Sequence, residues 1–432
     1  MSAAAETVRI EGLSHEGRGV AHRDGKAVFV AGALPGETVR LGHERHHRRY
    51  DEADAAEVLA PAAERVAPCC PHFGVCGGCA LQHLSPAAQI AAKQDSLLAN
   101  LKRLAGLEPR TLWPPLTGPA YTYRRRARLG LRYVQKKARV VVGFHEANGR
   151  YVTDSRVCPI LVPPGDRLPE MLAQLVGGLD ARERIPQVEF AAGDVAGALV
   201  FRLLGDASAA DIARLIAFGR EQDLSIWLQT GGLETLRLLH GAPLLGYALP
   251  EFGLSLHFLP TDFVQVNAAV NRAMVAAAIA RLELGAKDRV LEFYCGIGNF
   301  SLALARSAGE VTSVEGDETL VRRARANAVA NGIGNVAFHV ADLDAPMSDA
   351  PWLAEACDAV LLDPPRTGAR ALVPQLARLA PRRILYVSCH PATLARDGEA
   401  LAAAGFGLAA AGVADMFPQT AHAEAMALFE RE

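Results

Sequence analysis

The back half of the chain alternates short apolar runs with longer alanine-rich stretches. Each run ends in an acidic residue, glycine or cysteine, and polar positions at helical spacing follow it. This alternation is typical of parallel strands joined by helices in a doubly wound sheet. A helix is expected over 267–284, and strands are expected to begin at Arg289, Val311, Val336, Ala359 and Ile384.

The front of the chain has a different pattern. Residues 1–60 contain short β-type runs at Val8–Ile10, Ala27–Val30 and Glu37–Leu41, which glycine-containing turns separate. Several short strands with such turns predict a small closed barrel of the oligonucleotide-binding type. Between the two patterns, an amphipathic helix over 85–106 precedes mixed and mostly β sequence. We therefore predict three domains, at 1–60, 61–262 and 263–432, in a multi-domain α/β protein.

Charge is distributed unevenly between the two halves. The whole chain has a net charge of −2, but residues 1–150 carry +8 and residues 151–432 carry −10. A basic front half indicates a polyanionic partner, although chance segregation of solvated charge gives the same sum. Within the front half, arginine and histidine cluster between residues 40 and 49, next to Tyr50.

Arginines also alternate with tyrosines over residues 121–133. Alternate residues of a strand share one face. Cations and aromatic rings on one face suit an RNA backbone and its unstacked bases, whereas the simpler interpretation is a solvated edge strand. We favour RNA because the whole front half is basic. The candidate RNA-binding residues here are Arg124, Arg126, Arg128 and Arg132.

The sequence also indicates the cellular compartment and the expected state of the cysteines. No apolar run is long enough to span a membrane, and the first residues lack the basic and apolar parts of a signal peptide. We expect a cytoplasmic protein, and a monomer. In the cytoplasm, the eight cysteines are expected to be reduced, metal-bound or catalytic rather than paired in disulfides.

Four cysteines fall within residues 69–79, separated mainly by glycine and proline. Cys76 and Cys79 form a CxxC motif, and Cys70 precedes them. Cys158, which proline follows, is the natural fourth ligand. Four thiolates suit either zinc or a [4Fe–4S] cluster, and the spacing leaves both open.

The predicted sheet has the features of a nucleotide-type site. Gly296 and Gly298 follow the first strand and allow a ligand to approach the backbone. Glu315, after the second strand, is placed to accept hydrogen bonds from ribose hydroxyls. A third glycine at the dinucleotide spacing is missing, which disfavours NAD. With Glu292, Asp342 and Asp363, the series of strand-end acids looks like an S-adenosylmethionine-dependent methyltransferase.

Cys389 follows the fifth strand, where its surroundings alone favour a small core residue. Its wider context changes that interpretation. Several segments closely resemble the bacterial RNA 5-methyluridine methyltransferases, and this resemblance spans the whole predicted C-terminal domain. The matching segments are Phe263–Asn267, Phe293–Phe300, Asp363–Gly368, Ser388–Asp397 and the tail around His422 and Glu424.

The resemblance implies a mechanism. Carbon-5 of uracil is a poor nucleophile until a thiolate adds to carbon-6, and a base must later remove the carbon-5 proton. By chemistry alone, His422 or Glu424 suits the role of base; the resemblance implies Glu424, with Cys389 as nucleophile. It also implies an RNA contact at Phe263. The residues that it assigns to the methyl donor are Gln265, Tyr294, Asn299, Glu315, Asp342 and Asp363.

The front half narrows the resemblance. Residues 11–21 resemble the start of a TRAM domain, an RNA-binding barrel. Family members with both this barrel and the cysteine cluster act on 23S ribosomal RNA. They hold a [4Fe–4S] cluster, which implies Cys70, Cys76, Cys79 and Cys158 as its ligands. Alternatives are an enzyme that acts on transfer RNA or on both RNAs, and an RNA-binding iron–sulfur protein without turnover.

The chain departs from the family pattern at three positions. Tyr294 stands where phenylalanine is usual. In the tail, Gln419 and Ala421 replace a usual histidine and glycine. Both tail positions lie close to the predicted base, Glu424.

Overall fold

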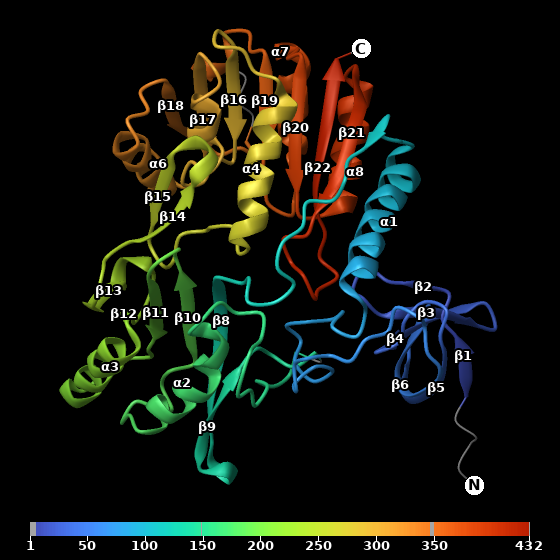
Figure 1. Cartoon of the computed structure of the whole chain (residues 1–432), viewed down its shortest axis with the longest axis vertical. Coiled ribbons are helices and arrows are strands. Elements are labelled where there is room, and N and C mark those ends of the chain that lie inside the picture. Colours follow the sequence, from blue (N-terminus) through green and yellow to red (C-terminus); the bar gives the residue numbers. More distant parts are fainter. Residues whose placement is uncertain (1–5, 148, 346–349, 432) are drawn as a thin grey trace.

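The computed structural model describes residues 6–147, 149–345 and 350–431. A blue N-terminal barrel and a green central sheet lie below a large yellow-to-red sheet that the C-terminal half forms (Figure 1). Among the described residues, no helix is both long enough and apolar enough to cross a membrane.

The N-terminal domain is a single curled sheet in the order β1-β5-β6-β4-β3-β2. Only two residues separate the edge strands β1 and β2, so the sheet bends until its two edges come close together. Its interior is filled by small and branched side chains such as Val28, Val30 and Val39, as the sequence pattern predicts. The strands are β1 (Thr7–Arg9), β2 (Gly12–Leu13), β3 (Gly19–Arg23), β4 (Lys26–Ala31), β5 (Thr38–His46) and β6 (Tyr50–Ala60).

The central domain is a second six-stranded sheet, in the order β13-β12-β11-β10-β8-β9. Helices α2 (Leu168–Gly177) and α3 (Ala209–Gln222) bury leucines against it. The strands are β8 (Arg126–Val134), β9 (Arg139–Gly143), β10 (Gln187–Ala192), β11 (Gly197–Arg202), β12 (Leu224–Gln229) and β13 (Arg237–His240). Within the described residues, the short 3-10 helices are Gln135–Lys137, Gly165–Arg167, Leu233–Thr235, Pro250–Phe252, Pro351–Leu353 and Arg370–Leu372.

The C-terminal sheet has the order β18-β17-β16-β19-β20-β22-β21-β7. Its first five strands are parallel, and β22 runs antiparallel to both β20 and β21. The five predicted strands are therefore present. Their bounds are β16 (Arg289–Phe293), β17 (Glu310–Glu315), β18 (Val336–Val340), β19 (Ala359–Leu362) and β20 (Arg383–Ser388), with β21 (Phe406–Ala414), β22 (Glu424–Arg431) and β7 (Thr111–Leu112) completing the sheet.

Helices cover both faces of this sheet. One apolar core lies under α4, α5 and α6, and a second lies under α1, α7 and α8. This is the doubly wound arrangement that the alternating pattern predicts. The helices are α1 (Pro86–Ala105), α4 (Ala268–Leu282), α5 (Ser301–Ala305), α6 (Glu318–Ala330), α7 (Val373–Leu379) and α8 (Pro391–Ala403).

The C-terminal layer takes in segments that precede the predicted boundary at residue 263. Helix α1 buries Leu97 and Leu101 in the core shared with α8, and β7 extends the sheet beside β21. The hairpin of β14 (Leu245–Leu249) and β15 (Leu254–Phe258) packs into the core under α4. The chain thus enters the C-terminal layer early, leaves it to form the central sheet, and then returns.

Candidate active site

A cavity of about 690 Å³ opens at the carboxyl ends of the parallel strands. The strand order reverses between β16 and β19, which is where open α/β sheets bind ligands. The structure brings together here residues from Tyr247 to Glu424, which are distant in the sequence. The lining includes Phe263, Gln265, Tyr294, Asn299, Glu315, Asp342, Asp363, Cys389, His422 and Glu424.

The turn after β16 is held in an unusual backbone conformation. Tyr294 has φ 65° and Gly296 has φ 55°, and a left-handed tyrosine is uncommon outside constrained sites. The Gly296 amide donates to Glu315 Oε2 at 3.0 Å, so the acid at the end of β17 is tied to the turn. Asn299 exchanges two hydrogen bonds with Asn271 on α4, each 2.9 Å long. The turn is therefore fixed before any ligand binds.

Glu292 differs from the other strand-end acids. It lies buried beneath the glycine turn, where its Oε2 accepts hydrogen bonds from Ser301 and Ser313. Burial is the main reason that its pKa is raised to about 8. Glu292 therefore supports the turn from inside the protein, whereas Glu315 and Asp363 face the cavity.

Asp363 ends β19 and begins the Asp-Pro-Pro-Arg turn. Gln265 donates to its Oδ2 at 3.4 Å, and burial is the main reason that its pKa is raised to about 7. The turn is fastened to the first two turns of α8. The contacts are Thr393 Oγ1 to the carbonyl of Arg366 (3.0 Å), Arg396 Nη2 to the carbonyl of Thr367 (2.7 Å) and the amide of Ala369 to Asp397 Oδ2 (2.7 Å).

Cys389 and Glu424 meet through strand pairing. Ser388 at the end of β20 pairs with Ala425 near the start of β22. The next positions along the two chains are Cys389 and Glu424, so the pairing places both at the same end of the sheet. Both side chains line the cavity.

The pKa values of both groups are raised in this site. The pKa of the Cys389 thiol is raised to about 11, mainly by burial and then by Glu424, while Arg366 opposes the shift. The pKa of Glu424 is raised well above its ordinary value by burial and by Asp363, and Arg366 again opposes the shift. Arg366 is thus the positive charge that favours the ionised form of both.

An Arg366→Met variant should lose rate at every pH below the pKa of the Cys389 thiol. Without the cation, that pKa rises further, so less thiolate exists at neutral pH. A rise of about one unit lowers the rate about tenfold, and the deficit stays nearly constant up to about pH 10 because both enzymes remain below the thiol pKa. Single-turnover methyl transfer between about pH 6 and pH 10 measures this, with Arg366→Lys as the charge-keeping control. Equal rates for the Met and Lys variants across this range would contradict the role.

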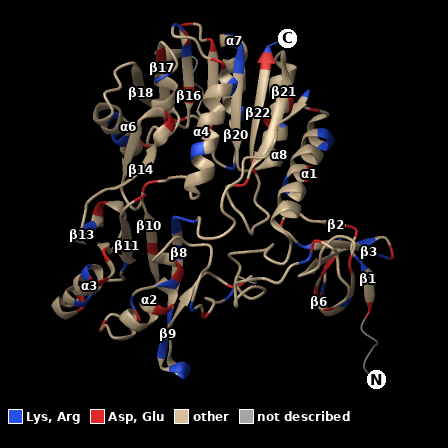
Figure 2. Cartoon of the chain, viewed as in Figure 1, with Lys and Arg blue, Asp and Glu red and all other residues tan. Residues whose placement is uncertain are grey.

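The predicted RNA-binding arginines occupy different environments. On β8, Arg128 and Arg132 are exposed, as alternation predicts. Arg126 is not free, because its guanidinium donates to the carbonyls of Asp262 and Pro260 at 2.5 and 3.2 Å. Figure 2 shows blue segments on β8 and at the tip of the β8–β9 hairpin.

Arg124 and Phe263 lie nearer the cavity. Arg124 bridges to Leu161 and Asn267, and its Nε donates to the Arg126 carbonyl at 2.8 Å. Phe263 is 62% exposed while it lines the cavity mouth, which is unusual for a large apolar ring. Phe263 thus lies where a ligand in the cavity would contact it. Arg124 and Arg126 instead link β8 and the residues before it to neighbouring segments of the chain.

The four predicted metal-ligand cysteines converge. Cys70, Cys76, Cys79 and Cys158 line one small cavity although Cys158 is distant in sequence. Burial is the main reason that all four pKa values are raised, to about 11 for Cys79 and about 12 for Cys158. Within the described ranges, no group of three or more His, Cys, Asp or Glu side chains is placed to hold a metal ion.

Sequence reasoning missed part of the site. Phe417 lines the cavity, and Gln89 and Lys93 on α1 contact the loop that bears it. A signal was available: Gln89, Lys93, Leu97 and Leu101 recur every four residues and form the buried face of α1. Two polar residues on such a face indicate a specific buried partner.

Known proteins resemble this chain over most of its length. A match to the family described as tRNA (Uracil-5-)-methyltransferase covers residues 87–432. The chain is 50% identical to the 23S rRNA (uracil(1939)-C(5))-methyltransferase RlmD of Alkalilimnicola ehrlichii, covering 98% of this chain and 96% of that one. This chain belongs to the RNA uracil-C5-methyltransferase family. The family prediction is confirmed, and these enzymes use S-adenosylmethionine as methyl donor.

Three further comparisons agree. The same enzyme of Hahella chejuensis is 48% identical, covering 98% of this chain and 97% of that one. Residues 5–41 match the TRAM domain, which confirms the predicted barrel. A crystal structure of Pyrococcus abyssi tRNA (uracil-54, C5)-methyltransferase with S-adenosyl-L-homocysteine superposes with a TM-score of 0.75, at 22% identity, over 98% of this chain and 100% of that one. That likeness supports the fold.

Proposed function

We propose that this protein transfers a methyl group from S-adenosylmethionine to carbon-5 of a uridine in 23S ribosomal RNA through a covalent intermediate on Cys389. The observation that carries the proposal is the single cavity that holds Cys389, Glu424 and the acids after β17, β18 and β19. A nucleophile, a base and a donor site within one cavity are what the reaction needs.

The chemistry of uracil carbon-5 requires the following steps of these residues. The Cys389 thiolate adds to carbon-6 of a uracil that has left its stack, and carbon-5 becomes an enolate carbon. Carbon-5 attacks the sulfonium methyl, and S-adenosylhomocysteine leaves. The Glu424 carboxylate then removes the carbon-5 proton, and the electron pair re-forms the double bond as the thiolate leaves carbon-6. Glu315, Asp342, Gln265, Tyr294, Asn299 and Asp363 would hold the donor in the cavity that they line.

Charges around the cavity suit these steps. The raised pKa of Glu424 makes its carboxylate a stronger base than an exposed glutamate. Arg366 stabilises the anionic forms of Cys389 and Glu424 in turn. Phe263, exposed at the mouth, is placed to stack on a base that enters the cavity.

The RNA substrate is assigned from the relatives. The relatives at 48–50% identity are named for uracil 1939 of 23S rRNA, so we assign the equivalent uridine here, and with it a cytoplasmic location. The matched family is described for tRNA, which makes tRNA the second candidate. With methyl-labelled S-adenosylmethionine, the protein should transfer the labelled methyl group to 23S rRNA from a strain lacking this gene. It should not transfer the label to tRNA from the same strain. The opposite preference would overturn the assignment.

Four thiolates suit either zinc or a [4Fe–4S] cluster. The four thiols line one shared cavity, and the resemblance to family members that carry both the barrel and the cysteine group favours the cluster. We therefore assign Cys70, Cys76, Cys79 and Cys158 to a [4Fe–4S] cluster. Such a cluster would join residues 70–79 to the central domain and supply the positive charge that ionises four buried thiols.

Removing the iron should loosen the front half of the chain. We expect an iron-free preparation, or a Cys158→Ser variant, to lose protection from proteolysis around residues 66–84 and to bind RNA about tenfold or more weakly. Cys69→Ser is the matched control, because Cys69 is exposed and lies outside the cavity wall. Proteolysis and RNA affinity that do not change on iron loss would contradict a structural role.

A further inference from the structure

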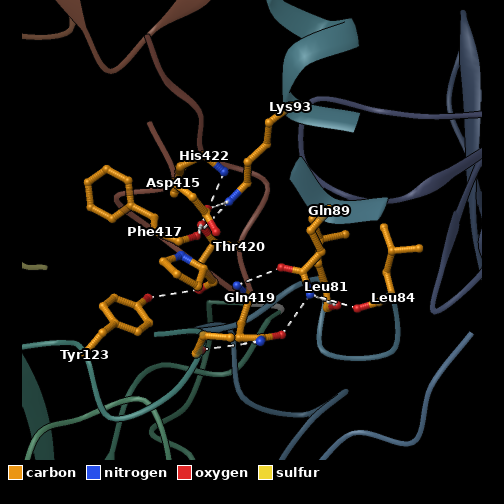
Figure 3. A network of polar contacts seen from close by, with 12 residues as sticks. Leu81, Leu84, Gln89, Lys93, Tyr123, Asp415, Phe417, Gln419, Thr420 and His422 are labelled. Carbon is orange, nitrogen blue, oxygen red and sulfur yellow. Dashed lines mark hydrogen bonds and ion pairs between the residues drawn. The ribbon is translucent and has the colours of Figure 1, made fainter. Parts of the chain in front are cut away.

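The loop between β21 and β22, residues 415–423, carries two cavity residues and leads directly into Glu424. Phe417 and His422 from this loop line the cavity, with their rings edge to face at 6.0 Å. The loop joins two neighbouring strands of the sheet, and its polar groups are held by residues from the front half of the chain, as Figure 3 shows.

Gln89 of α1 makes the most extensive of these contacts. Its Nε2 donates to Gln419 Oε1 at 3.0 Å, and its Oε1 accepts from the Gln419 amide at 2.9 Å. The same Nε2 lies 2.9 Å from the Leu81 carbonyl and 2.8 Å from the Leu84 carbonyl. Gln89 is 1% exposed, and Gln419 is held with φ 68°. The side-chain amide of Gln89 thus holds Gln419 in its left-handed backbone conformation.

Lys93, one helical turn further on, fixes the beginning of the loop. Its Nζ lies 2.6 Å from Asp415 Oδ1 and donates to the Phe417 carbonyl at 2.9 Å. The Lys93 side chain is 2% exposed and that of Asp415 is 8% exposed. Tyr123 adds a bond from its hydroxyl to the Pro418 carbonyl at 2.9 Å.

The loop is also where the front domains converge. The amides of Ala80 and Leu81, just after Cys79, donate to the Gln419 carbonyl at 2.9 and 3.0 Å. Gly17, in the barrel, is so close that an added Cβ would lie 3.0 Å from Leu81 and 3.3 Å from Ala421. The barrel and the residues that directly follow Cys79 therefore both lie against the 415–423 loop, which precedes Glu424.

We propose that Gln89 and Lys93 are positioning residues for the proton-removal step: they hold the 415–423 loop so that Glu424 stays enclosed and directed at carbon-5. This inference rests on the proposed function. The nucleophile lies after β20 and the donor site lies on β16–β19, whereas the loop carries Phe417 and His422 and leads into the base. Loosening the loop should therefore slow resolution of the adduct more than its formation.

The test separates the two half-reactions. RNA and methyl-labelled donor react in a single turnover, and the denaturation-resistant protein–RNA adduct is followed over time. For Gln89→Met we expect adduct formation at close to the parental rate and resolution about 10- to 100-fold slower, as a misplaced catalytic group gives. Gln94→Met is the control, because it makes the same change five residues along α1 and outside the network. It should form and resolve the adduct at the rates of the unmodified protein.

A second variant guards against loss of folding. Lys93→Met with Asp415→Leu removes the ion pair without leaving a buried charge unpaired, an exchange that is often tolerated. It should show the same delay in resolution. Formation and resolution that fall by equal factors in both variants, or resolution at the parental rate, would overturn the inference.

Glu424→Gln distinguishes this failure from failure of the proposed function. An adduct that accumulates with Glu424→Gln but not with Gln89→Met contradicts only the positioning role. If no adduct accumulates with Glu424→Gln, the proposed base assignment fails first.

Discussion

Cys389→Ala is expected to abolish methyl transfer while leaving the fold intact and RNA binding near the parental level. Without a thiolate, carbon-5 of uracil stays a poor nucleophile, so we expect a loss of at least about a thousandfold in single-turnover rate. Cys389 is half-buried at the end of β20, and alanine there creates no large cavity. Transfer of the labelled methyl group to 23S rRNA measures the effect.

Cys357→Ala is the matched control for this experiment. Cys357 is a buried cysteine of the same domain, and it packs in the core under α7 rather than on the cavity wall. It should keep near-parental turnover. A Cys389→Ala enzyme that methylates at more than a small fraction of the parental rate would contradict covalent catalysis.

Glu424→Gln is expected to stop the reaction after methyl transfer. The amide fills the same buried space as the carboxyl group but cannot accept the carbon-5 proton, so the methylated adduct should accumulate. We expect turnover to fall by about three orders of magnitude, the scale of a lost general base that has no substitute. Denaturing electrophoresis of protein with labelled RNA detects the stalled species.

His422 is the competing base, because it lines the same cavity. Burial and nearby cations lower its pKa, so its imidazole is largely neutral at pH 7. His422→Ala should turn over without accumulating adduct. Accumulation with His422→Ala, together with turnover by Glu424→Gln, would reverse the assignment.

The cavity was predictable because its residues follow strands. Glu315, Asp342, Asp363 and Cys389 each stand at the carboxyl end of an apolar run, and parallel strands bring those ends to one edge. The sequence also indicated the barrel and the cysteine group, because glycine turns and closely spaced cysteines are local signals. The pattern did not distinguish acids that line the cavity from acids that support the turn. Glu292 also stands at the end of a strand, but it is buried beneath the turn.

The remaining features depend on contacts between distant segments. Gln89 and Gln419 are 330 residues apart, and no local pattern links the buried face of α1 to a loop before the last strand. The pairing of β7 with β21 and the use of Arg126 to anchor Asp262 are of the same kind. Gln419 departs from the family pattern, yet here it adopts a left-handed backbone conformation and its backbone amide donates to Gln89 Oε1.

The most direct measurement uses an RNA fragment in which 5-fluorouridine replaces the target uridine. Fluorine at carbon-5 leaves no proton for Glu424 to remove, so the adduct cannot resolve. The account predicts that protein, RNA and S-adenosylmethionine give a stable complex, and that mass spectrometry finds a methylated fluorouridine on the peptide containing Cys389. Methylation without any covalent complex, or a complex on another residue, would contradict it.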